Sequence, residues 1–423
     1  MRRFIMEDLI RWKSSTNRKP LILRGARQVG KTWAMKELAK TFDNFYYLNL
    51  EKDKDVFLEG DVDPKKIIER IEIKFSTSLN ENTLIIVDEI QEIRSAVTSL
   101  KYFQEEYSWL PVICAGSQLG ILQHEKVSFP VGKVTFFDIF PLSFLEFLLA
   151  VGYPGFVKKL VDKNWLALES FHKELIDLLK IYYCTGGLPE VVQDYIDNGN
   201  LNNTREIQQN LLDLYYSDFS KHIPNNIVSK VRQVWQSIPA HLSKENKKFI
   251  WGAVREGARS KDYEDAIQWL IDLSLVYKVT NVNNAELPLS GFEQKNIFKI
   301  YLLDVGLLGA MSNLPIQVIL QKNEIFEQFK GALTEQYVLQ QLVAKNGIIP
   351  NYWTGGKSEV DFIFTDELKM IPLEVKAQEN LKSQSLKSFY TKYGIYCYRT
   401  SLSFYKKQDW LTNIPLYGIL AGF

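Results

Sequence analysis

A chain of 423 residues is long enough for about three domains, and 46% hydrophobic with 13% aromatic residues can fill large cores. The formal net charge is +1, which excludes a general electrostatic attraction to nucleic acid or to an acidic membrane surface. The three cysteines (Cys114, Cys184 and Cys397) are odd in number and far apart. This spacing argues against a disulfide framework and a CxxC metal site, and it indicates a reducing compartment.

The N-terminal segment, MRRFIMEDLIRW, mixes acidic with basic residues and lacks the apolar stretch of a signal peptide. The most membrane-like stretch, Ile139–Val157, is interrupted by Pro141, Glu146 and Pro154, and is too short to span a bilayer. We therefore expect a cytoplasmic protein that does not enter the membrane.

The first predicted helix carries Phe4, Ile5, Leu9 and Trp12 near helical spacing, and we expect it to pack on the domain that follows. The surrounding region is basic, which leaves two interpretations open. It is either a nucleic-acid patch or, more simply, a solvated face beside an anion-binding site. The basic residues are Arg2, Arg3, Arg11, Lys13, Arg18, Lys19, Arg24 and Arg27.

Residues 20–32, PLILRGARQVGKT, join a short apolar strand to a G-x-x-x-x-G-K-[ST] motif, and residues 33–40 behind it have the pattern of a helix. Glycines let successive backbone N–H groups turn inward around a phosphate, and the N-terminus of the following helix favours the same anion. Lys31 is expected to reach the β- and γ-phosphates of ATP, and Thr32 to offer its hydroxyl to Mg²⁺. The predicted nucleotide-binding loop consists of Gly25, Ala26, Arg27, Gln28, Val29, Gly30, Lys31 and Thr32.

Two acidic residues end a later predicted strand. Residues 45–50 (FYYLNL) form a second strand, Asp63-Pro64 starts a helix to about residue 75, and residues 83–89 (TLIIVDE) form a buried strand. Ligands of open α/β sheets bind at the carboxyl ends of strands. We therefore expect Asp88 to hold Mg²⁺ through water and Glu89 to polarise the attacking water.

The next elements are an amphipathic helix over residues 95–107, strands over 111–115 and 133–139, and a buried helix over 141–149 that Pro141 begins. The first of these strands ends at Gly116-Ser117-Gln118. Ser117 or Gln118 is a candidate sensor of the γ-phosphate, and the alternative is an ordinary cap between a strand and a helix.

Seven segments occur in order over essentially the whole chain. They are GARQVGKT, LIIVDEIQ, AGSQLG, VGKVTFFDIFPLSFLEFL, YYCTGGLPEVV, FKIYLLDVGLL and EVDFIF…PLEVKA. In this order they resemble the prokaryotic AAA-type P-loop ATPases fused to a C-terminal domain of unknown function. The resemblance implies phosphate and Mg²⁺ roles for Lys31 and Thr32, a Mg²⁺ role for Asp88, a water-activating role for Glu89 and a sensor role for Ser117. Many relatives have Arg where this sequence has Lys133, so an arginine role at this position is not carried over.

Residues 156–193 are predicted to be largely helical, and Gly186-Gly187 before Pro189 mark the end of one helix and the start of the next. The resemblance places this motif in a small helical lid over the nucleotide. A helix over residues 201–220 follows.

Residues 227–282 have the order helix, helix, helix, strand, which is typical of a winged-helix module. The third helix carries Asp262, Glu264, Asp265 and Asp272, with Lys261 as its one basic residue, and this face would repel phosphates. We interpret the module as a scaffold or a partner surface. A connector over residues 285–296 leads to a strand over 297–303, after which Asp304 is expected to cap a helix.

The last part has a different chemistry. A helix over residues 329–342 bears Glu335, a strand over 359–364 bears Asp361, and a strand over 371–377 bears Glu374 and Lys376 on one face. This is the arrangement of restriction-endonuclease-like (PD-(D/E)xK) folds, in which the carboxylates bind Mg²⁺ and the lysine steadies the attacking water. An exposed sheet face also carries such pairs without metal, and a nuclease fold can persist as a binding module.

The predicted fold class is α/β. We expect a P-loop NTPase (AAA-type) core at residues 1–150, a helical lid at 151–225, a winged-helix-like module at 226–296 and a restriction-endonuclease-like domain at 297–423. The predicted function is an ATP-binding, slowly hydrolysing ATPase that acts as a conformational switch with Mg²⁺. Two alternatives stay open for the C-terminal half, a Mg²⁺-dependent nuclease regulated by ATP and a non-catalytic protein-interaction module. Its partner is accordingly a nucleic acid or a protein, and the number of subunits is open.

Overall fold

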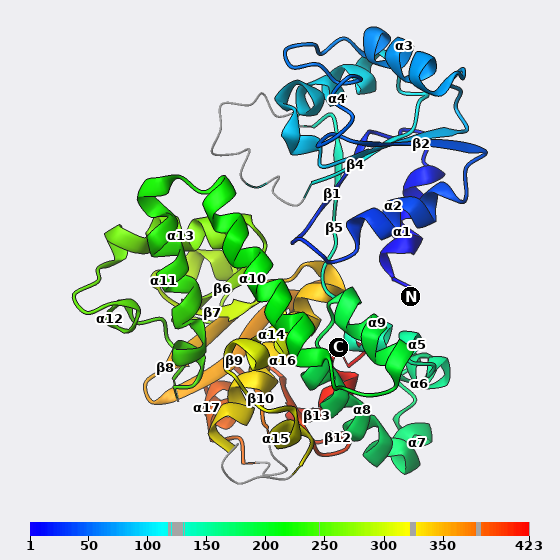
Figure 1. The fold of residues 1–423 in the computed structure, drawn as a ribbon. Helices are drawn as coiled ribbons and strands as arrows, with labels where there is room; N and C mark the ends of the chain where they lie inside the picture. Colours follow the sequence, from blue (N-terminus) through cyan, green and yellow to red (C-terminus); the bar gives the residue numbers. More distant parts are fainter. Residues whose placement is uncertain are drawn as a thin grey trace. The chain divides into compact units, whose positions relative to one another are not determined.

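The computed structural model describes residues 1–116, 120, 130, 132–244, 246–321, 327–377 and 382–422. The chain divides into two compact units, shown in Figure 1. Residues 2–140 with 272–274 form the first unit, and residues 141–271 with 275–423 and Met1 form the second. Among the described helices, none has the length and apolarity that a membrane span requires.

The first unit is a parallel α/β sheet with helices between its strands. Within its described part the strand order is β2-β3-β4-β1-β5, and every neighbouring pair is parallel. The strands are β1 (Leu21–Arg24), β2 (Asn44–Asn49), β3 (Thr83–Asp88), β4 (Val112–Ala115) and β5 (Thr135–Asp138). The helices are α1 (Ile5–Lys13), α2 (Lys31–Ala39), α3 (Pro64–Phe75), η1 (Ile90–Glu92) and α4 (Arg94–Glu106). This order confirms the predicted alternation of strands and helices, and it places β4 beside the P-loop strand β1.

Local sequence signals explain these elements. The side chain of Asp63 accepts a hydrogen bond from the Lys65 N–H (2.9 Å), and Pro64 occupies the first turn of α3, as predicted. Isoleucines of α3 and of β3 belong to one buried cluster, so the helix packs on the sheet by its apolar face. The side chains of β3 are all buried, which explains its continuous apolar run.

The second unit begins with helices and ends with a mixed sheet. Its first helices are α5 (Phe144–Ala150), α6 (Pro154–Val161), α7 (Trp165–Leu168), η3 (Glu169–Phe171), α8 (His172–Thr185), α9 (Pro189–Asn198), α10 (Thr204–His222), α11 (Asn225–Leu242), α12 (Trp251–Val254) and α13 (Ser260–Asp272). The later helices are η4 (Leu289–Phe292), α14 (Val305–Met311), α15 (Ile316–Leu320), α16 (Glu327–Asn346), α17 (Gln384–Tyr393) and η6 (Leu416–Gly418). The predicted helix over residues 141–149 begins later, at Phe144, because Ser143 and Glu146 form a capping box there.

The sheet of the second unit has the described order β12-β13-β11-β10-β9-β8-β6-β7. Its strands are β6 (Val276–Val282), β7 (Glu293–Leu302), β8 (Asn351–Gly355), β9 (Ser358–Asp366), β10 (Lys369–Val375), β11 (Cys397–Ser401), β12 (Lys406–Lys407) and β13 (Leu411–Pro415). Because β6 pairs with both β7 and β8, the segments predicted as a winged-helix-like module and as a restriction-endonuclease-like domain share one sheet. The predicted boundary at residue 296 therefore falls inside β7.

A buried aspartate joins the helices of the second unit. Asp304 caps α14 through the Leu307 N–H (3.1 Å), as predicted, and it also accepts from the Gly187 N–H (2.6 Å) and from Nε2 of Gln340 (2.9 Å). Burial raises the pKa of Asp304. The helices predicted as a lid, residues 151–225, thus belong to the second compact unit, where α8 and α10 both pack on α14.

The Gly186-Gly187 pair is explained by two groups that approach it closely, as well as by the end of a helix. A Cβ on Gly186 would lie 2.0 Å from Oδ1 of Asp304, and a Cβ on Gly187 would lie 2.1 Å from the carbonyl oxygen of Leu142. The Leu142 N–H in turn donates to the Gly187 carbonyl (2.6 Å). Residues without a side chain are required where the Asp304 carboxylate and the Leu142 backbone approach these two positions.

Substitution Gly187→Ala is expected to lower the free energy of unfolding of the second unit by about 2–4 kcal/mol, because the Leu142 backbone must move away. Gly155→Ala in α6 is the matched control, since a Cβ there meets no atom within 4 Å. Chemical denaturation of both variants gives the difference. Equal stability of the two would contradict the close packing described here.

Candidate functional site

The phosphate-binding loop lies between β1 and α2. Three of its residues adopt positive φ, with 141° at Gly25, 66° at Gln28 and 99° at Gly30. A Cβ at position 25 would lie 2.2 Å from the carbonyl oxygen of Ile139, so the loop backbone lies directly on the segment after β5. Because α2 starts at Lys31, its first N–H groups have no intrahelical acceptor and are directed to the loop.

Lys31 is buried and its ammonium lies on the loop's own carbonyls. Nζ donates to the carbonyl oxygens of Gly25 (2.9 Å) and Ala26 (2.7 Å). Burial lowers the pKa of Lys31 to about 8, while the nearby carboxylates of Glu89 and Asp88 oppose the shift. The ammonium is therefore poised to exchange these carbonyl oxygens for the oxygens of a phosphate.

The acid at the end of β3 faces the hydroxyl at the start of α2. Thr32 Oγ1 donates to Oδ2 of Asp88 (2.7 Å), and the hydroxyl of Tyr47 on β2 donates to the same oxygen (2.8 Å). Burial and the hydrogen bond to Asp88 raise the pKa of Tyr47. A hydroxyl and a carboxylate are hard oxygen ligands of the kind that Mg²⁺ takes beside phosphates, so Thr32 and Asp88 fit the predicted metal.

Glu89 follows Asp88 with φ 52°, a left-handed conformation that is uncommon outside glycine. Its Oε2 accepts a hydrogen bond from Nε2 of Gln91 (2.7 Å). Strained residues of this kind often occur at functional sites, because the surrounding structure holds them in place. Sequence reasoning missed Tyr47, which lies within the second predicted strand, and Gln91, which follows the predicted strand that ends in Glu89.

The structure brings together most of the predicted nucleotide-site residues. Residues 25–32 with Asp88 and Glu89 gather at the carboxyl ends of β1 and β3. Ser117 and Gln118, the candidate sensors, lie outside the described residues. Lys133, for which no arginine role was carried over, pairs with Glu105 at 2.8 Å.

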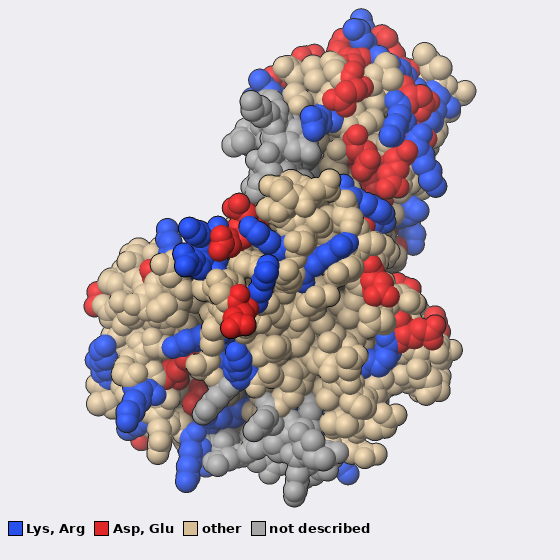
Figure 2. Space-filling view, turned by 60° about the vertical axis from the view of Figure 1, so that its left-hand side comes forward, with Lys and Arg blue, Asp and Glu red and all other residues tan. Residues whose placement is uncertain are grey.

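The basic N-terminal region is largely engaged within the first unit. Arg24 makes two hydrogen bonds to Asp138 (2.9 and 2.8 Å), Lys19 donates to the Gly132 carbonyl (2.7 Å), and Arg11 pairs with Asp8. On the face shown in Figure 2, outside the grey atoms, Lys and Arg are interspersed with Asp and Glu. These contacts favour a solvated face over a nucleic-acid patch.

The predicted D…E-x-K strands are neighbours in the second unit. On β9 and β10, Phe362 is the partner of Leu373, and Oδ2 of Asp361 accepts from the Val375 N–H (2.8 Å). Glu374 and Lys376 form an ion pair at 2.9 Å, so they share a face as predicted.

Glu335 of α16 is neutralised by lysines. Its Oε1 accepts from Nζ of Lys247 (2.8 Å), its Oε2 accepts from the hydroxyl of Tyr301 (3.0 Å), and Nζ of Lys299 lies 4.0 Å from Oε2. Burial alone would raise the pKa of Glu335, but Lys247 and Lys299 hold it below its usual range. Lys299 also pairs with Glu359 at 2.6 Å.

Asp361 lies in the same electrostatic environment. Burial and the nearby Glu335 raise the pKa of Asp361 to about 7. Within the described residues, no group of three or more His, Cys, Asp or Glu side chains is placed to hold a metal ion. Glu335, Asp361 and Glu374 do not form such a group in the structure, in which Lys247 and Lys299 compensate the charge of Glu335, and the metal site stays a prediction.

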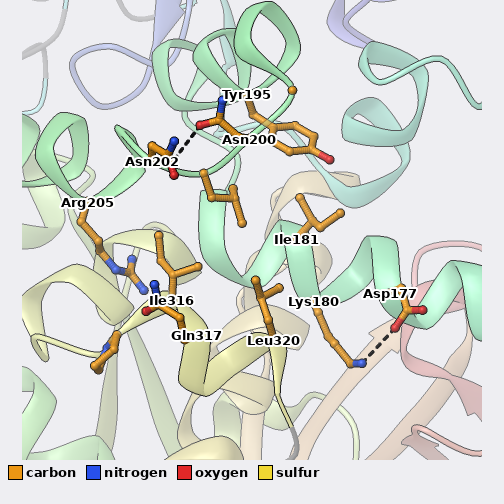
Figure 3. Close-up of a pocket in the computed structure, with 13 residues that line it drawn as sticks. Asp177, Lys180, Ile181, Tyr195, Asn200, Asn202, Arg205, Ile316, Gln317 and Leu320 are labelled. Carbon is orange, nitrogen blue, oxygen red and sulfur yellow. Dashed lines mark hydrogen bonds and ion pairs between the residues drawn. The ribbon is translucent and has the colours of Figure 1, made fainter.

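A pocket of about 760 Å³ lies between α8, the end of α9, α10 and α15 of the second unit (Figure 3). Arg205 lines it, with Nε donating to the Leu314 carbonyl (3.1 Å) and Nη1 donating to Oε1 of Gln208 and to the Gly306 carbonyl (3.2 Å). Nη2 is buried without a described acceptor, and it lies 2.8 Å from where a Cβ on Gly309 would be. The guanidinium therefore serves mainly to join α10 to α14.

Three family models match separate parts of the chain. Residues 17–148 match the AAA domain, residues 176–317 match a domain of unknown function (DUF8612), and residues 330–417 match another domain of unknown function (DUF4143). No curated protein matches the chain.

Solved structures resemble the chain distantly. The Walker-type ATPase of Pyrococcus abyssi is 14% identical, with 73% of this chain and 95% of that chain covered and a TM-score of 0.46. The Aeropyrum pernix ORC1 protein in complex with DNA is 12% identical (76% and 95% covered, TM-score 0.28), and the ORC2 protein of that organism is 11% identical (75% and 94% covered, TM-score 0.34). Because these identities and TM-scores are low, the fold assignment of the first unit rests on the AAA domain match and on the geometry of the phosphate-binding loop.

The first unit is a P-loop ATPase-like α/β domain of the AAA type. The phosphate-binding loop, Lys31, Thr32, Asp88 and Glu89 lie close together at one edge of its sheet.

Nucleotide affinity is expected to fall as the pH rises above about 8. Free Lys31 loses its proton near that pH, whereas a bound triphosphate favours the protonated form, so binding must take up a proton. The loss approaches about tenfold per pH unit. Fluorescence titration from pH 6.5 to 9.5 measures it, and calorimetry in two buffers measures the proton uptake. An affinity that stays constant to pH 9.5 would show that Lys31 has an ordinary pKa.

Removal of one member of the Lys247–Glu335 pair is expected to destabilise the second unit by about 3–5 kcal/mol, because a buried charge loses its partner. The double variant Lys247→Met with Glu335→Gln should recover part of this loss. Denaturant unfolding of the two single variants, Lys247→Met and Glu335→Gln, and of the double variant completes the double-mutant cycle. Stabilisation of the wild type by Mn²⁺, absent from Glu335→Gln, would instead indicate a metal site.

Proposed function

We propose that the protein binds Mg²⁺-ATP at residues 25–32, hydrolyses it slowly and uses the bound state as a conformational switch. The observation that carries this proposal is the convergence of Lys31, Thr32, Asp88 and Glu89 at the carboxyl end of the parallel sheet. The match of residues 17–148 to the AAA domain supports the same function.

Each residue has a proposed role. The backbone N–H groups of residues 25–31 surround the phosphates, and the Lys31 ammonium neutralises the β- and γ-phosphates. Glu89 orients and polarises the attacking water, with Gln91 holding the carboxylate in place. Ser117 is proposed as the γ-phosphate sensor.

Thr32 and Asp88 would hold the Mg²⁺ of the nucleotide, with Tyr47 orienting the carboxylate of Asp88. When bound, Mg²⁺ neutralises charge on the phosphate oxygens. Closure of the site around the triphosphate is proposed as the slow step, so turnover is limited by rearrangement.

The second unit is proposed as the part that responds. Helices α11, α12 and α13 followed by the β6–β7 hairpin support a winged-helix-like arrangement, and α16 with β9 and β10 supports a restriction-endonuclease-like one. Glu264 and Asp265 of α13 are exposed, which favours a protein partner over a nucleic acid at that helix. The ion pairs of Glu335 favour a binding role over nuclease activity.

A cytoplasmic location is part of the proposal. Cys114, Cys184 and Cys397 are all free and buried, which suits a reducing compartment.

Substitution Lys31→Ala is expected to weaken ATP binding at least about 100-fold, because the phosphates lose their main cation. Glu89→Gln should keep binding and lower hydrolysis by about 10²–10⁴-fold. Calorimetry and a phosphate-release assay measure the two effects. Lys40→Ala is the control, since Lys40 is exposed and pairs with Glu37 at the far end of α2. Unchanged affinity of Lys31→Ala would disprove the site.

A further inference from the structure

Arg3 connects the phosphate-binding loop to the point where the chain leaves the first unit. Its guanidinium is buried, although it stands just before α1. Nη1 donates to the carbonyl oxygen of Val29 (2.9 Å), and Nη2 donates to the carbonyl oxygen of Phe140 (2.6 Å). Val29 belongs to the loop, and Phe140 is the last residue before the chain enters the second unit.

The bond to Val29 orients a donor of the loop. Because a trans peptide is planar, the C=O of Val29 and the N–H of Gly30 point in opposite directions. A guanidinium on the carbonyl orients this peptide plane and polarises its N–H. Gly30 is the N-cap of α2, with φ 99°, so its N–H is among the groups available to an anion at the helix start.

The bond to Phe140 lies on a stiff segment. Before Pro141, the Ile139 N–H donates to the Arg24 carbonyl (2.8 Å), and after it the Leu142 N–H donates to the Gly187 carbonyl (2.6 Å). Proline fixes its own φ and confines the preceding residue to extended conformations. A displacement of Phe140 is therefore passed along the backbone to Leu142, where little torsional freedom exists to absorb it.

We propose that Arg3 is a positioning residue of the ATP site that also transmits phosphate occupancy from the Val29–Gly30 peptide to the crossing at residues 139–142. This inference rests on the proposed ATP binding. Phosphate binding at Gly30 shifts the peptide plane, the carbonyl of Val29 moves with it, and the guanidinium carries the shift to Phe140. If Arg3 only anchored α1, phosphate binding at Gly30 would not be linked to Phe140.

The test compares Arg3→Gln and Arg3→Lys with two controls. Arg2→Gln removes the neighbouring exposed arginine, whose contact is Glu7 at 3.5 Å. Trp12→Phe removes another anchor of α1, the hydrogen bond from Nε1 to the Lys19 carbonyl (2.8 Å). For each protein, thermal unfolding, calorimetric affinity for Mg²⁺ with ADP or a non-hydrolysable ATP analogue, and hydrogen–deuterium exchange of peptides over residues 136–142 are measured.

In the wild type, the ATP analogue is expected to slow exchange at the amides of Ile139 and Leu142. Arg3→Gln should lower affinity about tenfold and lose this response at saturating analogue. Arg3→Lys keeps the charge without the fork that spans two carbonyls, so it should fold and bind but also lose the response. Both controls should retain it.

If the ATP analogue slows exchange at Ile139 and Leu142 as much in Arg3→Lys as in Arg2→Gln, the inference is overturned, whether or not Arg3→Gln folds. A loss in Trp12→Phe equal to that in Arg3→Gln would reduce Arg3 to an anchor of α1. Wild-type protein that binds neither nucleotide would show instead that the proposed function is wrong, and the inference would fall with it.

Discussion

The nucleotide site depends on one constraint, a loop of backbone that must be shaped before a phosphate arrives. Amide N–H groups can replace the water around a phosphate only if they already point inward, since ordering them on binding would cost affinity. In this chain the shape is imposed from outside the loop, where Gly25 lies against the backbone of Ile139 with no room for a side chain. The segment after β5 is therefore a wall of the site as well as the route to the second unit.

Much of this site follows from local sequence. The loop motif, the apolar strand that ends in Asp88 and Glu89, and the caps at Asp63 and Asp304 each depend on neighbours within a few residues, so their patterns predict them. The long-range contacts that support the site cannot be predicted from local sequence in this way. Tyr47 reaches Asp88 across 41 positions, and nothing in the spacing of these two residues marks the pair.

The glycines of the second unit illustrate the same limit. Gly186-Gly187 before Pro189 correctly predict the end of one helix and the start of the next. Their tighter requirement comes from Asp304 and Leu142, which approach from distant parts of the chain. The predicted boundary at residue 296 lies inside β7, because β6 pairs with both β7 and β8, and the pairing of β6 with the distant β8 has no signal in the local sequence.

The charges around Glu335 show why a motif can predict which residues share a strand face without predicting what those residues bind. The D…E-x-K pattern is carried by α16, β9 and β10, whereas Lys247 and Lys299 come from outside these elements. Burial favours a cluster with no net charge. Burial and the nearby Glu335 raise the pKa of Asp361, which favours its neutral form, while Glu335 and Glu359 pair with the two lysines. Because Lys247 and Lys299 already compensate the carboxylates of Glu335 and Glu359, a divalent ion at Glu335 would compete with these ammonium groups.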